Sequence, residues 1–168
     1  MNRLVFFVLI IFTSVSLNAQ DFSYLKDIDV NETNQYEEAE EAALECCCYL
    51  TGVRYDKKDN QRRLATEYIS DWMSAVYAQS YSLEELFEES TEQSEVYQVF
   101  FALNYIEYKD ELSLSELQAE ALKGVVSYCS NSSNKLKMTK ALKEIQKMIE
   151  TETLQDNIEN SGLVIAVQ

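Results

Sequence analysis

The stretch that decides the fold is SEVYQVFFALNYIEYK, residues 94–109. Placed on a helix, its apolar and aromatic side chains cover nearly the whole circumference. A helix that is apolar on all sides is typical of a domain centre, because other elements must cover every side. We therefore predict an all-α, single-domain bundle of five to six helices around this segment. The alternative is that part of it faces a partner or a ligand groove.

The segments around this helix have apolar residues at three-four spacing and polar starts that can cap a helix. Ser113, for example, stands three residues before Glu116, which is capping-box spacing. Gly124 costs its helix about 1 kcal/mol relative to alanine, so we expect a neighbouring helix to approach closely there. The other predicted helices are 34–51, 61–77, 82–89, 113–129 and 135–151.

The chain has no proline, only three glycines and no histidine. The turns of all-β folds use proline and glycine, so their scarcity favours long helices joined by polar loops. Histidine is the commonest general base and metal ligand, and its absence argues against most hydrolase and metalloenzyme classes. We therefore expect no catalytic residue, no bound metal and no cofactor.

The first twenty residues have the order of a secretory signal peptide. Arg3 is followed by an apolar run over 4–12 and a small-residue junction that ends at Gln20. The apolar part is shorter than the roughly 20 residues that a membrane-spanning helix needs. The predicted organisation is a signal peptide at 1–20, a polar lead-in at 21–33, a helical domain at 34–151 and a C-terminal tail at 152–168. No transmembrane segment is expected in the mature chain.

The chain is strongly acidic, with 29 Asp and Glu against 14 Lys and Arg and a formal net charge of −15. Nucleic-acid binding needs a basic face that neutralises phosphates, so a nucleic-acid partner is not expected. Solubility is the simplest interpretation of the acidity, and a cationic partner or bound cations are the alternative. Two acidic runs, 37–45 and 84–95, suggest either a solvated face or paired carboxylates for glycoside cleavage.

Four cysteines, Cys46, Cys47, Cys48 and Cys129, suggest disulfide bonding in an exported protein. Adjacent helical residues diverge by about 100°, so bridges within the triplet are geometrically poor. We therefore predict one bridge from Cys46 or Cys47 to Cys129. The alternative is four reduced cysteines, and the spacing favours neither a zinc site nor a catalytic thiol.

Two further groups are candidates for binding. Trp72, Phe100 and Phe101 form a possible ligand or partner surface, although core filling is the simpler role for each. The basic residues are interpreted as balancing neighbouring glutamates or as holding an anionic ligand. They are Arg54, Lys57, Lys58, Arg62 and Arg63.

The junction Leu17-Asn18-Ala19-Gln20 resembles the export signals common in Bacteroidetes bacteria. The segments Tyr49-Leu50, 65–73 (ATEYISDWM) and 125–129 (VVSYC) are similar to a family of small exported helical proteins of that group. The resemblance implies a helical domain and a periplasmic or surface location. It implies no activity and no site residues.

These observations predict an exported, non-catalytic interaction protein of the cell envelope. Its location is the periplasm or the cell surface of a Gram-negative bacterium. We expect a protein or peptide partner and a monomer or weak oligomer. The first alternative is a small-molecule or peptide binding module with a pocket beside Trp72, Phe100 and Phe101. The second is a carboxylate-based hydrolase.

Overall fold

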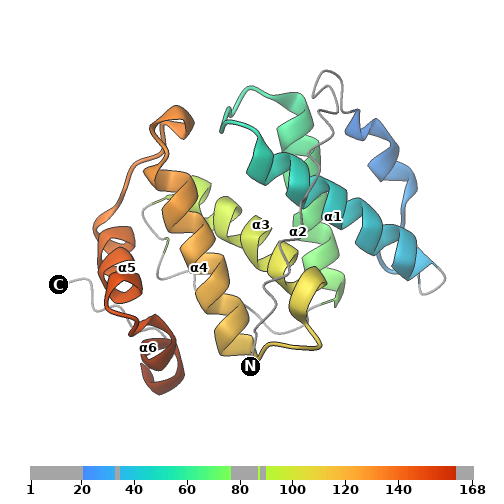
Figure 1. Ribbon diagram of the computed structural model, residues 1–168. Coiled ribbons are helices and arrows are strands. Elements are labelled where there is room, and N and C mark those ends of the chain that lie inside the picture. Colours follow the sequence, from blue (N-terminus) through green and yellow to red (C-terminus); the bar gives the residue numbers. More distant parts are fainter. Residues whose placement is uncertain (1–20, 33–34, 77–86, 88–89, 162–168) are drawn as a thin grey trace, which may run out of the picture.

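The computed structural model describes residues 21–32, 35–76, 87 and 90–161, and no strand occurs among them. The predicted all-α fold is confirmed (Figure 1). The elements in chain order are η1 (Phe22–Asp27), α1 (Tyr36–Gly52), α2 (Asn60–Val76), α3 (Thr91–Tyr108), α4 (Leu114–Ser130), η4 (Ser132–Asn134), α5 (Lys140–Glu150) and α6 (Leu154–Ser161). None of the described helices has the length and apolar character needed to cross a membrane.

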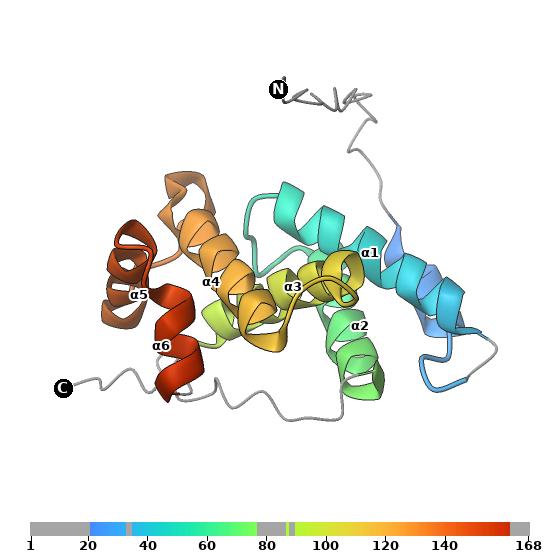
Figure 2. The ribbon, with the colours of Figure 1, turned by 60° about the horizontal axis from the view of Figure 1, so that its bottom comes forward.

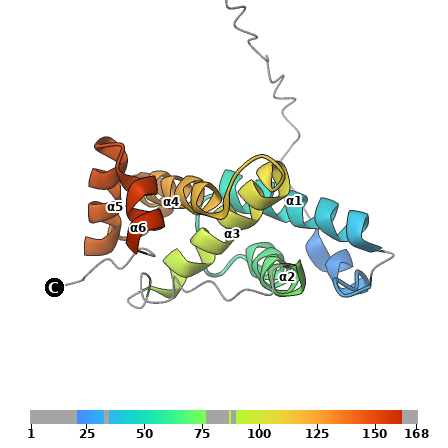
Figure 3. The ribbon, with the colours of Figure 1, turned by 90° about the horizontal axis from the view of Figure 1, so that it is seen from below.

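Helix α3 is the centre of the bundle, as its sequence predicts. It packs against α1 and α2 and also against α4. Seen from below, α3 crosses the middle of the molecule, with α1 and α2 towards one end and α5 and α6 at the other (Figure 3). Its buried residues are Gln93, Val96, Tyr97, Val99, Phe101 and Ala102.

The C-terminal end of the bundle differs from the prediction. The last predicted long helix begins at Lys140 rather than at residue 135, because residues 135–139 make other contacts. Buried Gln93 donates through Nε2 to the carbonyl of Lys137 at 2.6 Å, and the Thr139 side chain caps α5 by accepting from the Leu142 N–H. Residues 154–161, predicted as part of the C-terminal tail, form α6, which packs on α4 and α5 (Figure 2).

The polar lead-in at 21–33 contains the short helix η1, which docks on α2. Phe22 is fully buried and its ring meets that of Tyr49 edge-on, with centroids 5.1 Å apart. The predicted signal peptide at 1–20 and the part of the predicted C-terminal tail after Ser161 lie outside the described residues. The predicted helix 82–89 is described only at Phe87, which is buried.

The predicted disulfide is wrong. Cys46, Cys47, Cys48 and Cys129 are all free. The reason is that α1 packs against α2 and α3, whereas α4, which carries Cys129, packs against α3, α5 and α6. The Cys47 thiol therefore meets α3 and donates to the carbonyl of Val99 at 3.6 Å. Burial raises the pKa of Cys46 to about 12 and that of Cys129 to about 11, which keeps both thiols protonated at neutral pH.

The close approach expected at Gly124 is confirmed. A Cβ built at this position would lie inside the van der Waals surface of the Phe100 ring on α3. The missing side chain therefore lets α3 and α4 pack closely. Gly52, the last residue of α1, has no heavy atom within 4 Å of the corresponding Cβ position.

We predict that Gly124→Ala lowers the free energy of unfolding by about 1–3 kcal/mol, because the forced displacement of Phe100 outweighs the gain in helix propensity. Gly52→Ala is the matched control and should change stability by zero to about +1 kcal/mol. Urea denaturation of both variants tests this. Equal effects at the two glycines would contradict the close packing of α3 on α4.

Candidate functional site

The described residues form a cleft of about 460 Å³ between the loop 53–59, α2 and the start of α3. We call it the charged cleft, because it contains five carboxylates and three cationic side chains. Its lining residues are Tyr55, Asp56, Lys57, Asp59, Arg62, Arg63, Thr66, Glu67, Ser70, Thr91, Glu92, Glu95 and Gln98.

The loop 53–59 is held in place at both of its ends. Asp59 starts α2 by accepting from the N–H groups of Gln61 and Arg62, and it also accepts from the Tyr49 hydroxyl at 2.7 Å. At the other end, the Tyr55 N–H donates to the side-chain oxygen of Asn134, whose own amide donates to the carbonyl of Tyr128. The loop thus presents its side chains to α3 from a backbone fixed by α2, η4 and α4.

Arg62 lies at the base of the cleft and is only 4% exposed. Its guanidinium lies 4.3 Å from the centre of the Tyr55 ring, and Nη1 donates to the Leu50 carbonyl and the Tyr128 hydroxyl, both at 3.4 Å. Nε has no hydrogen-bond partner among the described residues, and no described carboxylate forms an ion pair with Arg62. A buried cation is therefore stabilised by an aromatic face and by neutral oxygens.

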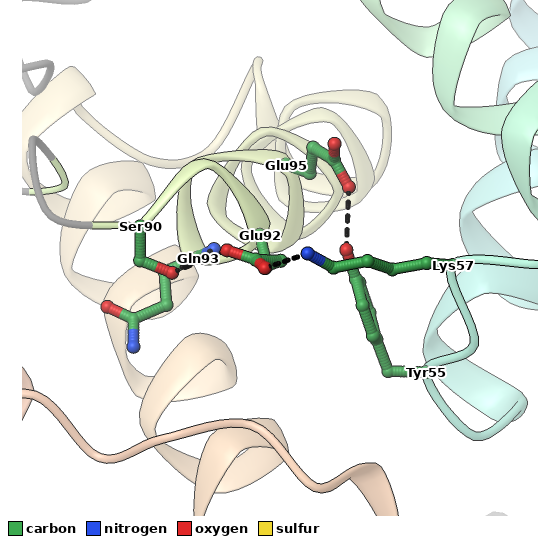
Figure 4. A network of polar contacts seen from close by, with 6 residues as sticks. All are labelled: Tyr55, Lys57, Ser90, Glu92, Gln93 and Glu95. Carbon is green, nitrogen blue, oxygen red and sulfur yellow. Dashed lines mark hydrogen bonds and ion pairs between the residues drawn. The ribbon is translucent and has the colours of Figure 1, made fainter.

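Side chains from the loop reach across the cleft to α3 (Figure 4). The Tyr55 hydroxyl donates to Glu95 at 3.1 Å, and Lys57 forms an ion pair with Glu92. Ser90 caps α3 by accepting from the Gln93 N–H, and its hydroxyl donates to Glu92 at 3.0 Å. Glu92 thus lies in the first turn of α3, where the helix dipole also favours a negative charge.

All the resolved pKa shifts in the cleft move the pKa further from neutral pH. The hydrogen bond from Lys57, helped by those from Ser90 and the backbone, lowers the pKa of Glu92 to about 2. Burial opposes ionisation of Asp59, but hydrogen bonds from Tyr49 and two backbone N–H groups outweigh it and lower the pKa. Burial, followed by the neighbouring Glu95, raises the pKa of Tyr55. These groups therefore keep their charge states at neutral pH.

The structure does not bring Trp72, Phe100 and Phe101 onto one surface. Phe101 is 1% exposed and lies in the core, with its ring between those of Tyr97 and Tyr105. Phe100 is partly buried against α4, near Tyr128. Trp72 is 1% exposed, yet it contributes to a separate groove of about 380 Å³.

We call this second concavity the Trp72 groove. It lies where the start of α1 meets the ends of α2 and α3. Its lining residues are Tyr36, Glu37, Glu40, Trp72, Ala75, Val76, Tyr105 and Lys109. The Trp72 indole meets the Tyr105 ring edge-on, with centroids 6.3 Å apart.

The basic group seen in the sequence is divided by the fold. Lys57, Arg62 and Arg63 line the charged cleft, whereas Arg54 lines a different depression beside Tyr128. The sequence did not indicate Tyr55 as part of a site, and Glu95 was considered only as the last residue of the acidic run 84–95. Their pairing joins residues 40 positions apart, and no local pattern indicates such a contact.

The described residues contain no group of three or more cysteine, aspartate and glutamate side chains placed to hold a metal ion. No family model, no curated protein and no solved structure matches the chain.

We predict that Tyr128→Phe lowers the free energy of unfolding by about 1–3 kcal/mol, because it leaves a buried guanidinium donor and the Val53 carbonyl each without a partner. The matched control is Tyr108→Phe, at a ring that is 40% exposed, which should stay within about 0.5 kcal/mol. Thermal and urea unfolding of both variants measure the difference. Equal losses would show that the hydroxyl of Tyr128 has no special role.

We predict that Lys57→Met raises the pKa of Glu92 from about 2 towards the ordinary 4.5. Carboxyl-detected NMR titration follows Glu92 directly, and Lys58→Met on the neighbouring exposed residue is the control. Because folding lowers the pKa of Glu92, this residue stabilises the folded state at pH values above its ordinary pKa of 4.5. That contribution is lost as the pH falls towards 2. An unchanged titration in Lys57→Met would contradict the ion pair.

Proposed function

We propose that this protein is a non-catalytic interaction protein, exported to the cell envelope, which binds a polypeptide segment of mixed charge in the charged cleft. The observation that carries the proposal is the cleft itself, which has a volume of about 460 Å³ and is lined by side chains of both charges. Charged groups arranged in this way favour selection of a partner with complementary charges.

The surface chemistry also favours a polar contact. Among the described residues, the exposed large hydrophobic side chains are Tyr24, Tyr36, Tyr108 and Leu114. Obligate interfaces are more hydrophobic than this, whereas transient interfaces have polar rims and charges that steer association. We therefore expect a reversible complex that is weakened by salt.

The chemistry of the cleft supports binding rather than catalysis. A general acid or base works best when its pKa lies near the operating pH. The pKa values of Glu92 and Asp59 are lowered and that of Tyr55 is raised, so all three move away from neutral pH. Glycoside cleavage needs one carboxyl group with a raised pKa, and Glu92 has a lowered one. Export is supported by the order of charge, apolar run and small-residue junction over residues 1–20.

A photo-crosslinking amino acid placed at Thr66 or Gln98, both on the cleft wall, tests the proposal in the native bacterium. We expect the same discrete adduct from both positions and none from Lys143, an exposed position on α5. No adduct from either cleft position, or the same adduct from Lys143, would overturn binding at the cleft. Recovery of the chain in the cytosol of fractionated cells would overturn export.

The matched charge controls are Lys57→Met and Lys58→Met. Both remove one positive charge from the same loop, but only Lys57 lines the cleft. We expect the adduct yield to fall several-fold in Lys57→Met and to stay unchanged in Lys58→Met. Equal loss in both variants would attribute the effect to net charge alone.

A further inference from the structure

We propose that the Trp72 groove is a second binding site, which takes the side-chain ammonium group of a lysine from a basic partner polypeptide. The proposal does not depend on the charged cleft, so failure of the crosslinking experiment leaves it intact. It rests on the aromatic walls of the groove, on its excess of carboxylates and on the lysine of this chain that already lies there.

The walls of the groove suit a cation. Tyr36, Trp72 and Tyr105 come from α1, α2 and α3, so three separate helices place aromatic rings around one concavity. The face of an aromatic ring attracts an ammonium group through its negative quadrupole. Tyr36, which is 47% exposed, and Tyr105, which already lies beneath the Lys109 ammonium group, are the rings that a cation in the groove can reach. The groove lies at the C-terminal ends of α2 and α3, where the helix dipoles favour positive charge, and at the start of α1, where the dipole favours the carboxylate of Glu37.

Lys109 shows which chemical group the groove stabilises. Its Nζ lies 5.7 Å from the centre of the Tyr105 ring and 2.5 Å from a carboxylate oxygen of Glu40. The hydrogen bond from Lys109 to Glu40 raises the pKa of this lysine above its ordinary value. The fold therefore already holds a lysine ammonium group between a carboxylate and an aromatic face.

The groove has capacity beyond Lys109. Glu37 is a second carboxylate in the lining, and it forms no ion pair with any described residue. One lysine thus faces two carboxylates in a concavity of about 380 Å³, within a chain of net charge −15.

The test uses Nα-acetyl-lysine N-methylamide as the probe and the full mature chain as the protein. Trp72 is the only tryptophan, so its indole fluorescence and its single indole N–H signal report on this groove alone. We expect saturable shifts of the indole signal with the lysine probe and none with the neutral norleucine analogue. Equal shifts with both probes would overturn recognition of the charge.

Variants at the groove define the contacts. Lys109→Met removes the competing ammonium group and should tighten probe binding at least threefold. Tyr36→Ala, at a side chain 47% exposed and therefore safe for folding, should weaken it at least threefold, as should Glu40→Gln. Tighter binding of putrescine than of the lysine probe would overturn the assignment to a polypeptide partner.

The matched controls lie on α4, where Lys123 and Glu120 form an exposed ion pair at 2.7 Å. Lys123→Met and Glu120→Gln make the same charge changes away from the groove, and neither should alter probe affinity. If Lys123→Met tightens binding as much as Lys109→Met does, the effect comes from net charge and the groove is not the site.

Discussion

The burial of α3 on several sides is the constraint on which the rest of the structure depends. A helix with apolar residues around its circumference must be covered by neighbours, and α1, α2 and α4 provide that cover. Close packing against α4 requires Gly124, because any side chain there would overlap the Phe100 ring. The same arrangement leads Cys47 to face α3 rather than Cys129, so the thiols stay apart and protonated.

The buried side chain of Arg62 connects α1, the loop 53–59 and α4. Arg62 contacts the end of α1 through the Leu50 carbonyl, the loop through the Tyr55 ring, and α4 through the Tyr128 hydroxyl. A buried guanidinium is costly unless its surroundings compensate, and here an aromatic face and neutral oxygens do so. Because these contacts fix the loop 53–59, they also fix one wall of the charged cleft.

The two concavities differ in the side chains that line them. The charged cleft contains groups of both signs, whereas the Trp72 groove combines aromatic rings with an excess of carboxylate. In the charged cleft the pKa of Glu92 is lowered and that of Tyr55 is raised, which supports the binding that we propose there. In this interpretation the acidity of the chain favours solubility and also attracts basic partners.

The sequence by itself determined the helical class, the central position of α3, the capping box at Ser113 and the close contact at Gly124, because all of these follow from local spacing and residue size. Only the tertiary structure decided that the four cysteines stay unpaired, where the last helices begin, and which charged side chains share a cleft. These features depend on contacts between residues far apart in the chain. Tyr55 reaches Glu95, and Gln93 holds the segment before α5, although no local periodicity indicates either contact.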